Sequence, residues 1–111
     1  MSYSVIPIPL FEKEAKRLAK KYPSLKKDLT TLVQSLKENP QQGIPLGGGC
    51  YKIRLAISSK QQGKSGGARV ITVVRIISSK IFLATIFDKS EKENVSAKEL
   101  KEIIKQIPSA P

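Results

Sequence analysis

Two apolar runs separated by a short polar turn constrain the fold of this chain more than any other feature. The first run covers residues 68–77 and the second covers residues 81–87, with Ser78-Ser79-Lys80 between them. Both runs are almost continuously apolar and rich in β-branched residues, which is typical of strands buried on both faces. We therefore predict that these two strands lie at the centre of a sheet.

A further strand is predicted at residues 51–57, where apolar and polar residues alternate. Because alternate side chains of a strand share a face, Lys52 and Arg54 should project from one face, about 7 Å apart. Residues 58–67 are glycine- and lysine-rich and are predicted to be a hairpin-type loop into the first central strand. A short strand at residues 3–8 is confined to an edge by Pro7.

Two helices are predicted before these strands. Pro9 suits a first helical turn, Pro23 ends that helix, Ser24 can cap a second one, and Asn39-Pro40 stops it. Apolar residues recur at helical spacing, at Phe11, Ala15, Leu18, Ala19 and Tyr22 in the first helix and at Leu25, Leu29, Leu32, Val33 and Leu36 in the second. The pair should form a helical hairpin with one face available to a sheet.

The C-terminal segment begins with a capping box, Ser96-Ala97-Lys98-Glu99, and an amphipathic helix should follow it. Residues 41–49 are predicted to be a loop. The element order β-α-α-β-β-β-α predicts an α+β fold, with a small, mostly antiparallel sheet, an N-terminal helical hairpin packed on it and a C-terminal helix. The 111 residues are predicted to form one domain, 1–111.

Positive charge is concentrated in the middle of the chain. Residues 39–87 contain no carboxylate and seven basic residues, which are Lys52, Arg54, Lys60, Lys64, Arg69, Arg75 and Lys80, within a net charge of +11. Strand charges commonly line the solvent face of a sheet, but that reading does not explain the absence of acidic neighbours. A surface that contacts phosphates explains both, with Arg69 joining from the neighbouring strand.

Other functional classes are excluded by residue types. The chain has no histidine and one cysteine, Cys50, so histidine-based catalysis, an internal disulfide and cysteine-rich zinc sites are not available. The segment Gly63-Lys64-Ser65-Gly66-Gly67 lacks the spacing of a P-loop and joins two strands; it is either a flexible tip or a phosphate-contacting loop. No apolar run is long enough to cross a membrane and no signal peptide is evident, so we expect a cytoplasmic protein without a membrane association.

The stretch YKIRLAISSKQQGKSGGARVIT, the apolar strand that ends in Phe87-x-Lys89-x-Glu91, and the serine-led C-terminal helix resemble one known family. They are similar to the RelE/HigB branch of the RelE/ParE toxins of bacterial toxin–antitoxin systems. The two preceding helices fit by order and length. The resemblance therefore covers nearly the whole chain.

The resemblance implies a ribosome-dependent mRNA interferase, in which the 2′-hydroxyl of the message attacks the adjacent phosphate. It implies catalytic roles for Lys52, Arg54, Arg69 and Lys89, with Lys52 or Arg54 positioning the substrate or acting as base and Arg69 stabilising the phosphate. Lys60, Lys64, Arg75 and Phe87 are expected RNA contacts. No metal or cofactor is expected. The expected partners are a cognate antitoxin, the ribosome and mRNA, with a homodimer or a heterotetramer with the antitoxin as assembly states.

A departure from the family pattern leaves alternatives open. Family members commonly carry a tyrosine at the position of Phe87, and phenylalanine can stack on a base but cannot transfer a proton. Two alternatives therefore stay open. One is a ParE-like inhibitor of DNA gyrase on the same fold, and the other is a non-catalytic RNA- or ribosome-binding protein. By residue type alone, core packing is the better default for Tyr51 and Phe87 than stacking on bases. Glu91, Lys92 and Glu93 are most simply a solvated loop.

Overall fold

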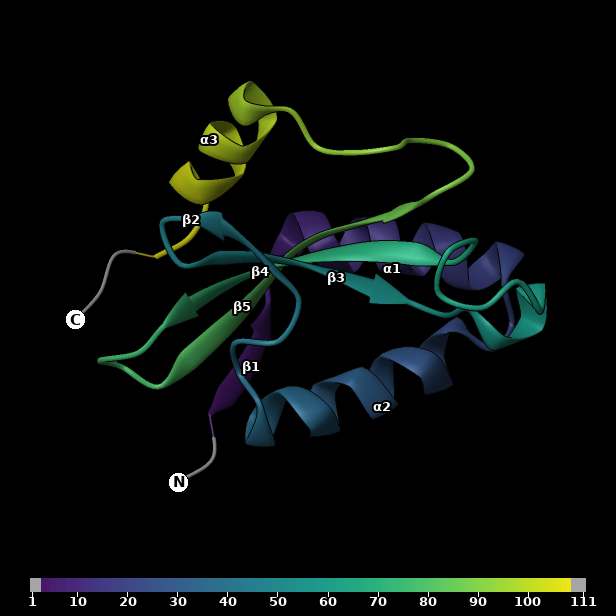
Figure 1. Cartoon of the computed structure of the whole chain (residues 1–111), viewed down its shortest axis with the longest axis horizontal. Coiled ribbons are helices and arrows are strands. Elements are labelled where there is room, and N and C mark those ends of the chain that lie inside the picture. The colour runs from purple at the N-terminus through teal and green to yellow at the C-terminus, as the bar shows by residue number, and fades with distance from the viewer. Residues whose placement is uncertain (1–2, 109–111) are drawn as a thin grey trace.

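The computed structural model describes residues 3–108 and shows three helices and a five-stranded sheet (Figure 1). In chain order the elements are β1 (Ser4–Pro7), α1 (Pro9–Lys21), α2 (Leu25–Glu38), β2 (Ile44–Gly47), β3 (Cys50–Leu55), the short 3₁₀ helix η1 (Ser58–Lys60), β4 (Ala68–Arg75), β5 (Lys80–Asp88) and α3 (Ala97–Lys105). The strand order across the sheet is β1-β5-β4-β3-β2. Only β1 pairs in parallel, with β5, so the predicted α+β fold with a mostly antiparallel sheet is confirmed.

The two central strands are buried along almost their whole length, as their apolar runs predict. Seven of eight residues in β4 and eight of nine in β5 are buried. The prediction was wrong at the turn, because β4 ends at Arg75 and not at residue 77. Ile76 and Ile77 are 60% and 93% exposed in a turn that the Ser79 amide closes by donating to the Ile76 carbonyl. A turn this tight needs Ser79 at φ +54°, which takes the chain out of the strand conformation.

Strand β2 lies in a segment predicted to be a loop. Its sequence, IPLG, contains a proline and shows no alternation, so no period-two signal marks it. The strand forms because Gly47, Gly48 and Gly49 adopt φ of +91°, +61° and +81° and fold the chain back onto β3. Strand β3 ends at Leu55 and not at residue 57 as predicted. Ile57 lies beyond the end of the strand and is buried.

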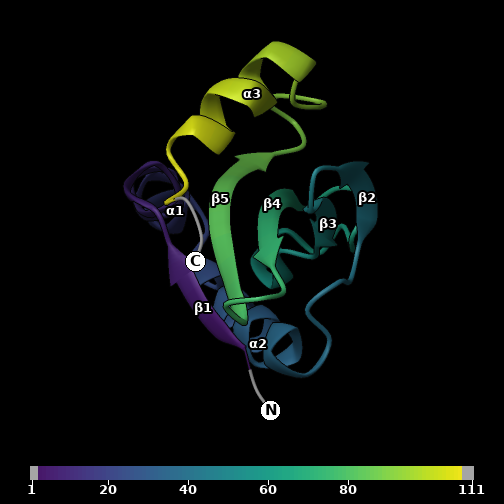
Figure 2. The same cartoon turned by 90° about the vertical axis from the view of Figure 1, so that its left-hand side faces the viewer.

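The helical hairpin covers one side of the sheet, and α3 lies on the other side (Figures 1 and 2). Leu18 of α1 and Leu25 and Leu36 of α2 have no exposed surface, which confirms the predicted apolar stripes. Ser24 does not cap α2 as predicted; its hydroxyl donates to Asp28 and accepts a hydrogen bond from the Ser59 amide instead. The capping box that begins α3 is confirmed. Within residues 3–108, no helix has the length and apolar character that crossing a bilayer requires.

Candidate functional site

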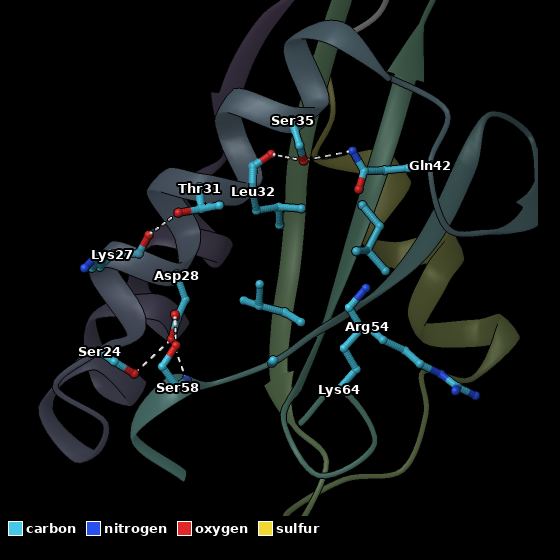
Figure 3. Close-up of a pocket in the computed structure, with 13 residues that line it drawn as sticks. Ser24, Lys27, Asp28, Thr31, Leu32, Ser35, Gln42, Arg54, Ser58 and Lys64 are labelled. Atoms are coloured by element: carbon cyan, nitrogen blue, oxygen red, sulfur yellow. Dashed lines mark hydrogen bonds between the residues drawn. The ribbon is translucent and has the colours of Figure 1, made fainter. Parts of the chain in front are cut away.

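Lys52 and Arg54 project from the face of the sheet that is turned away from α2. Their neighbours Ile53 and Leu55 line a groove together with residues of α2. Arg54 borders the same groove, but its side chain extends away from α2, as alternation along a strand requires (Figure 3). This arrangement is the one that the alternation in the sequence predicts. We call the face that carries Lys52 and Arg54 the cationic face.

Strand pairing adds Arg69 and Phe87 to the cationic face. Arg54 lies directly opposite Arg69 in the β3–β4 register, and Arg69 lies directly opposite Phe87 in the β4–β5 register. Side chains that face one another across paired strands share a face of the sheet. The two arginines and the phenyl ring therefore form one row across three strands, with Lys52 two residues from Arg54.

The guanidinium of Arg69 is held by main-chain carbonyls and not by a carboxylate. Its Nη1 donates to the carbonyls of Lys64 and Ala68 at 2.9 and 3.1 Å, and its Nη2 donates to that of Ser65 at 3.3 Å. Only 4% of Arg69 is exposed. Burial, and then repulsion from Arg54, lower the pKa of Arg69. Among residues 3–108 neither arginine belongs to an ion pair, so their charge is uncompensated.

Lys92 is a member of the site that the sequence did not indicate. Its ammonium lies 5.5 Å from the centroid of the Phe87 ring and pairs with Glu99, the glutamate of the α3 capping box. The ammonium of Lys92 and the backbone amide of Ser96 donate hydrogen bonds to the Glu99 carboxylate and hold its pKa below its usual range. Nothing in the local sequence distinguishes Lys92 from a solvated loop residue, because its position depends on how the loop after β5 returns over the sheet.

The same loop contacts Lys52. The ammonium of Lys52 donates to the side-chain oxygen of Asn94 at 3.3 Å, across 42 residues of sequence. Asn94 also accepts a hydrogen bond from the Val95 amide, which fixes its side chain. Since the partner of Lys52 is a neutral amide, this lysine also keeps its positive charge uncompensated.

A buried carboxylate, Asp88, anchors both loops beside the cationic face. Asp88 is fully buried and accepts hydrogen bonds from the Tyr22 hydroxyl at 2.5 Å, the Lys60 ammonium at 2.9 Å, and the amide and hydroxyl of Ser90 at 3.0 and 2.8 Å. These donors come from the end of α1, from η1 and from the loop after β5. Burial alone would raise the pKa of Asp88, but the hydrogen bonds from Tyr22, Lys60 and Ser90 outweigh it and hold the pKa well below its usual range.

This lowered pKa predicts a loss of stability in acid. The stabilisation from ionised Asp88 is fully present above the pKa of an unfolded aspartate, about 3.9, and is lost as the pH falls below it toward the lower folded value. Urea unfolding at pH 7, 4 and 3 should show a steeper decline for the wild-type chain than for Asp88→Asn. Equal declines would mean that Asp88 does not contribute to the acid sensitivity.

The remaining expected site residues are not all gathered at the cationic face. Lys60 does not contribute to the cationic face, because its side chain is only 9% exposed and its ammonium is paired with Asp88. Arg75 lies six residues from Arg69 on β4, about 20 Å along the strand. Lys64 is exposed in the loop whose carbonyls bind Arg69, and Lys89 follows β5, with its amide bonded to the Gly67 carbonyl and its ammonium 3.5 Å from Glu93.

Comparisons with known proteins agree on one family. The sequence model described as the RelE toxin of the RelE/RelB toxin–antitoxin system matches residues 10–109. The free-state structure of an arginine-to-alanine double mutant of the E. coli toxin RelE has a TM-score of 0.65 at 18% identity, covering 97% of this chain and all of that chain. A crystal structure of the isolated E. coli RelE toxin has a TM-score of 0.61 at 16% identity, covering 96% of this chain and all of that chain. No curated protein matches the sequence significantly.

Proposed function

Because this chain belongs to the RelE toxin family of toxin–antitoxin systems, we propose that its cationic face binds messenger RNA on the ribosome and cleaves it. Membership of the family implies an antitoxin as partner, and the resemblance of the structures supports the common fold. The observation that carries the cleavage proposal is the arrangement of Arg69. A buried guanidinium opposite a second arginine, with carbonyl partners only, is a fixed positive charge suited to a phosphate.

The proposed reaction needs a base, a stabilising charge and a proton donor. In the proposal the neutral amine form of Lys52, and not its ammonium, removes the proton of the 2′-hydroxyl. The 2′-oxygen then forms a bond to the adjacent phosphorus, and the bond from phosphorus to the 5′-oxygen breaks. Arg69, with Arg54 beside it, stabilises the charge of the pentacoordinate phosphorane. A proton then passes to the departing 5′-oxygen, and the products are a 2′,3′-cyclic phosphate and a 5′-hydroxyl.

We assign the proton transfer to the 5′-oxygen to Lys92. Phe87 has no hydroxyl, and only 5% of the residue is exposed, so its ring packs in the core and leaves little surface on which a base could stack. The ammonium of Lys92 lies 5.5 Å from the centroid of that ring, beside the residue that pairs with Arg69, and it carries transferable protons. Lys89, two residues after Phe87 in the chain, supports the same region as a second cation.

The test is translation in a purified bacterial system with added protein, followed by primer extension on the message. The proposal expects cuts that appear with ribosomes and are absent when the same RNA is incubated with the protein alone. Stalled translation with an intact message would restrict the role to ribosome binding. Unaffected translation would overturn the proposal, and a DNA gyrase supercoiling assay would then test the ParE-like alternative. Strongly salt-dependent binding to free RNA without cleavage would favour the non-catalytic alternative.

A further inference from the structure

The side chain of Asn94 is held in place by the start of α3. Asn94 lies two residues before Ser96, whose amide and hydroxyl form the capping box of that helix with Glu99. Val95, the residue between them, packs against the hydrophobic core. The side-chain oxygen of Asn94 accepts a hydrogen bond from the Val95 amide at 2.9 Å. The position of this oxygen is therefore set by the folded chain and does not depend on Lys52.

The same oxygen accepts a hydrogen bond from the Lys52 ammonium at 3.3 Å. Because the Val95 amide and the Lys52 ammonium can only donate, the oxygen of the Asn94 amide, and not its nitrogen, must face them. Lys52 is half-buried, and this is the one side-chain hydrogen bond that it makes within residues 3–108. A lysine nitrogen sits at the end of a flexible four-carbon stem, so the contact restricts where the nitrogen of Lys52 lies.

No carboxylate is bonded to Lys52 in the part of the chain that the structure describes. Its strand partners are Ile44 of β2 and Ile71 of β4, which carry no charge. The next residue on the same face of β3 is a second cation, Arg54. The carboxylates nearest to Asn94 in the chain have other partners: Glu91 pairs with Arg17, Glu93 with Lys89, and Glu99 with Lys92. The group that holds Lys52 is therefore neutral.

We infer that Asn94 is a positioning residue for Lys52, and that the site requires its neutrality. The inference rests on the proposed function, in which the neutral amine of Lys52 takes the proton of the 2′-hydroxyl. An amide oxygen accepts a hydrogen bond from an ammonium and from an amine alike, so it holds the nitrogen in both protonation states. The lone pair of the amine then lies away from Asn94 and is free to accept a proton. A carboxylate at this position would favour the ammonium, because an opposite charge stabilises the charged form.

The first test measures the amine of Lys52 without ribosomes or RNA. Acetic anhydride in trace amounts acetylates neutral amines of the full chain, and mass spectrometry of the peptide that contains Lys52 gives the rate between pH 7 and 10. Asn94→Asp keeps the size of the side chain and its acceptor oxygen and adds a negative charge. Lys52 should then be acetylated about two- to fivefold more slowly at pH 8, which is the effect of one exposed ion pair. The exposed Lys13 of α1 is the internal reference and should react at an unchanged rate.

The matched control is Asn39→Asp, which adds the same charge at the other asparagine of the chain, at the end of α2. It should leave the acetylation rate of Lys52 unchanged. A second variant, Asn94→Ala, removes the acceptor oxygen without adding charge, so it should not slow acetylation.

The second test is ribosome-dependent cleavage by the same proteins. Asn94→Asp should slow cleavage by the factor found for acetylation of Lys52, because both reactions use the neutral amine. Asn94→Ala should slow cleavage about tenfold, since a loosely held amine is misplaced for the proton transfer.

Three results would each overturn the inference: equal acetylation of Lys52 in wild type and Asn94→Asp, equal slowing by Asn39→Asp, or slower acetylation with unchanged cleavage. If the wild-type chain does not cleave the message, the proposed function fails. The acetylation rates still decide in that case whether Asn94 controls the amine of Lys52, so the two failures are distinct.

Discussion

Asp88→Asn is expected to lower the free energy of unfolding by about 3–5 kcal/mol, because it leaves the ammonium of Lys60 buried without its counter-charge. The neutral amide keeps the shape of the side chain and still accepts a hydrogen bond. The decrease in the free energy of unfolding therefore measures the effect of removing the negative charge. Urea unfolding followed by circular dichroism measures it. This is the largest stability effect that we expect from a single near-isosteric change in the chain.

Two further variants show whether buried charge is the cause. Glu91→Gln removes the partner of Arg17 in an exposed ion pair of the same loop and should leave the free energy of unfolding nearly unchanged. Combining Asp88→Asn with Lys60→Met removes both charges and should recover a large part of the loss. If the double variant is no more stable than Asp88→Asn alone, the pair is not held by charge complementarity and our account of this cluster is wrong.

Arg69→Ala is expected to reduce ribosome-dependent cleavage about 100- to 1,000-fold, the usual cost of removing one preorganised donor from a transition state. The physical reason is that Arg69 presents a fixed charge whose orientation is set by the carbonyls of Lys64 and Ser65. Arg69→Lys keeps the charge but not the planar fork of donors, so its activity should also fall well below wild type. Primer extension over a time course, at equal protein concentration, measures both variants.

The control for this experiment is Arg17→Ala. Arg17 is an arginine on α1 whose side chain is 58% exposed and paired with Glu91, and its removal should leave cleavage within about twofold of wild type. Near-ultraviolet circular dichroism must first show that each Arg69 variant has kept its tertiary structure, because the residue is buried. A folded Arg69→Ala protein that cuts at the wild-type rate would remove Arg69 from the chemistry.

The sequence by itself determined the elements whose signal is local. The central strands follow from two apolar runs, the helices from apolar residues at helical spacing, and the start of α3 from Ser96 and Glu99. The common face of Lys52 and Arg54 follows from period-two alternation alone. These features depend on residues within about one turn or a few strand positions of each other, so the order of residue types is sufficient to predict them.

Tertiary structure decided the features that join distant segments. Lys60 does not contribute to the cationic face because its ammonium pairs with Asp88, which is 28 residues away in sequence. The local sequence around Lys60 does not predict this pairing. Lys92 reaches Phe87, and Asn94 reaches Lys52, only because the loop after β5 returns over the sheet. The sequence therefore supplied the charges, and the packing of distant segments determined which of them are neutralised inside the protein and which stay available to bind a phosphate.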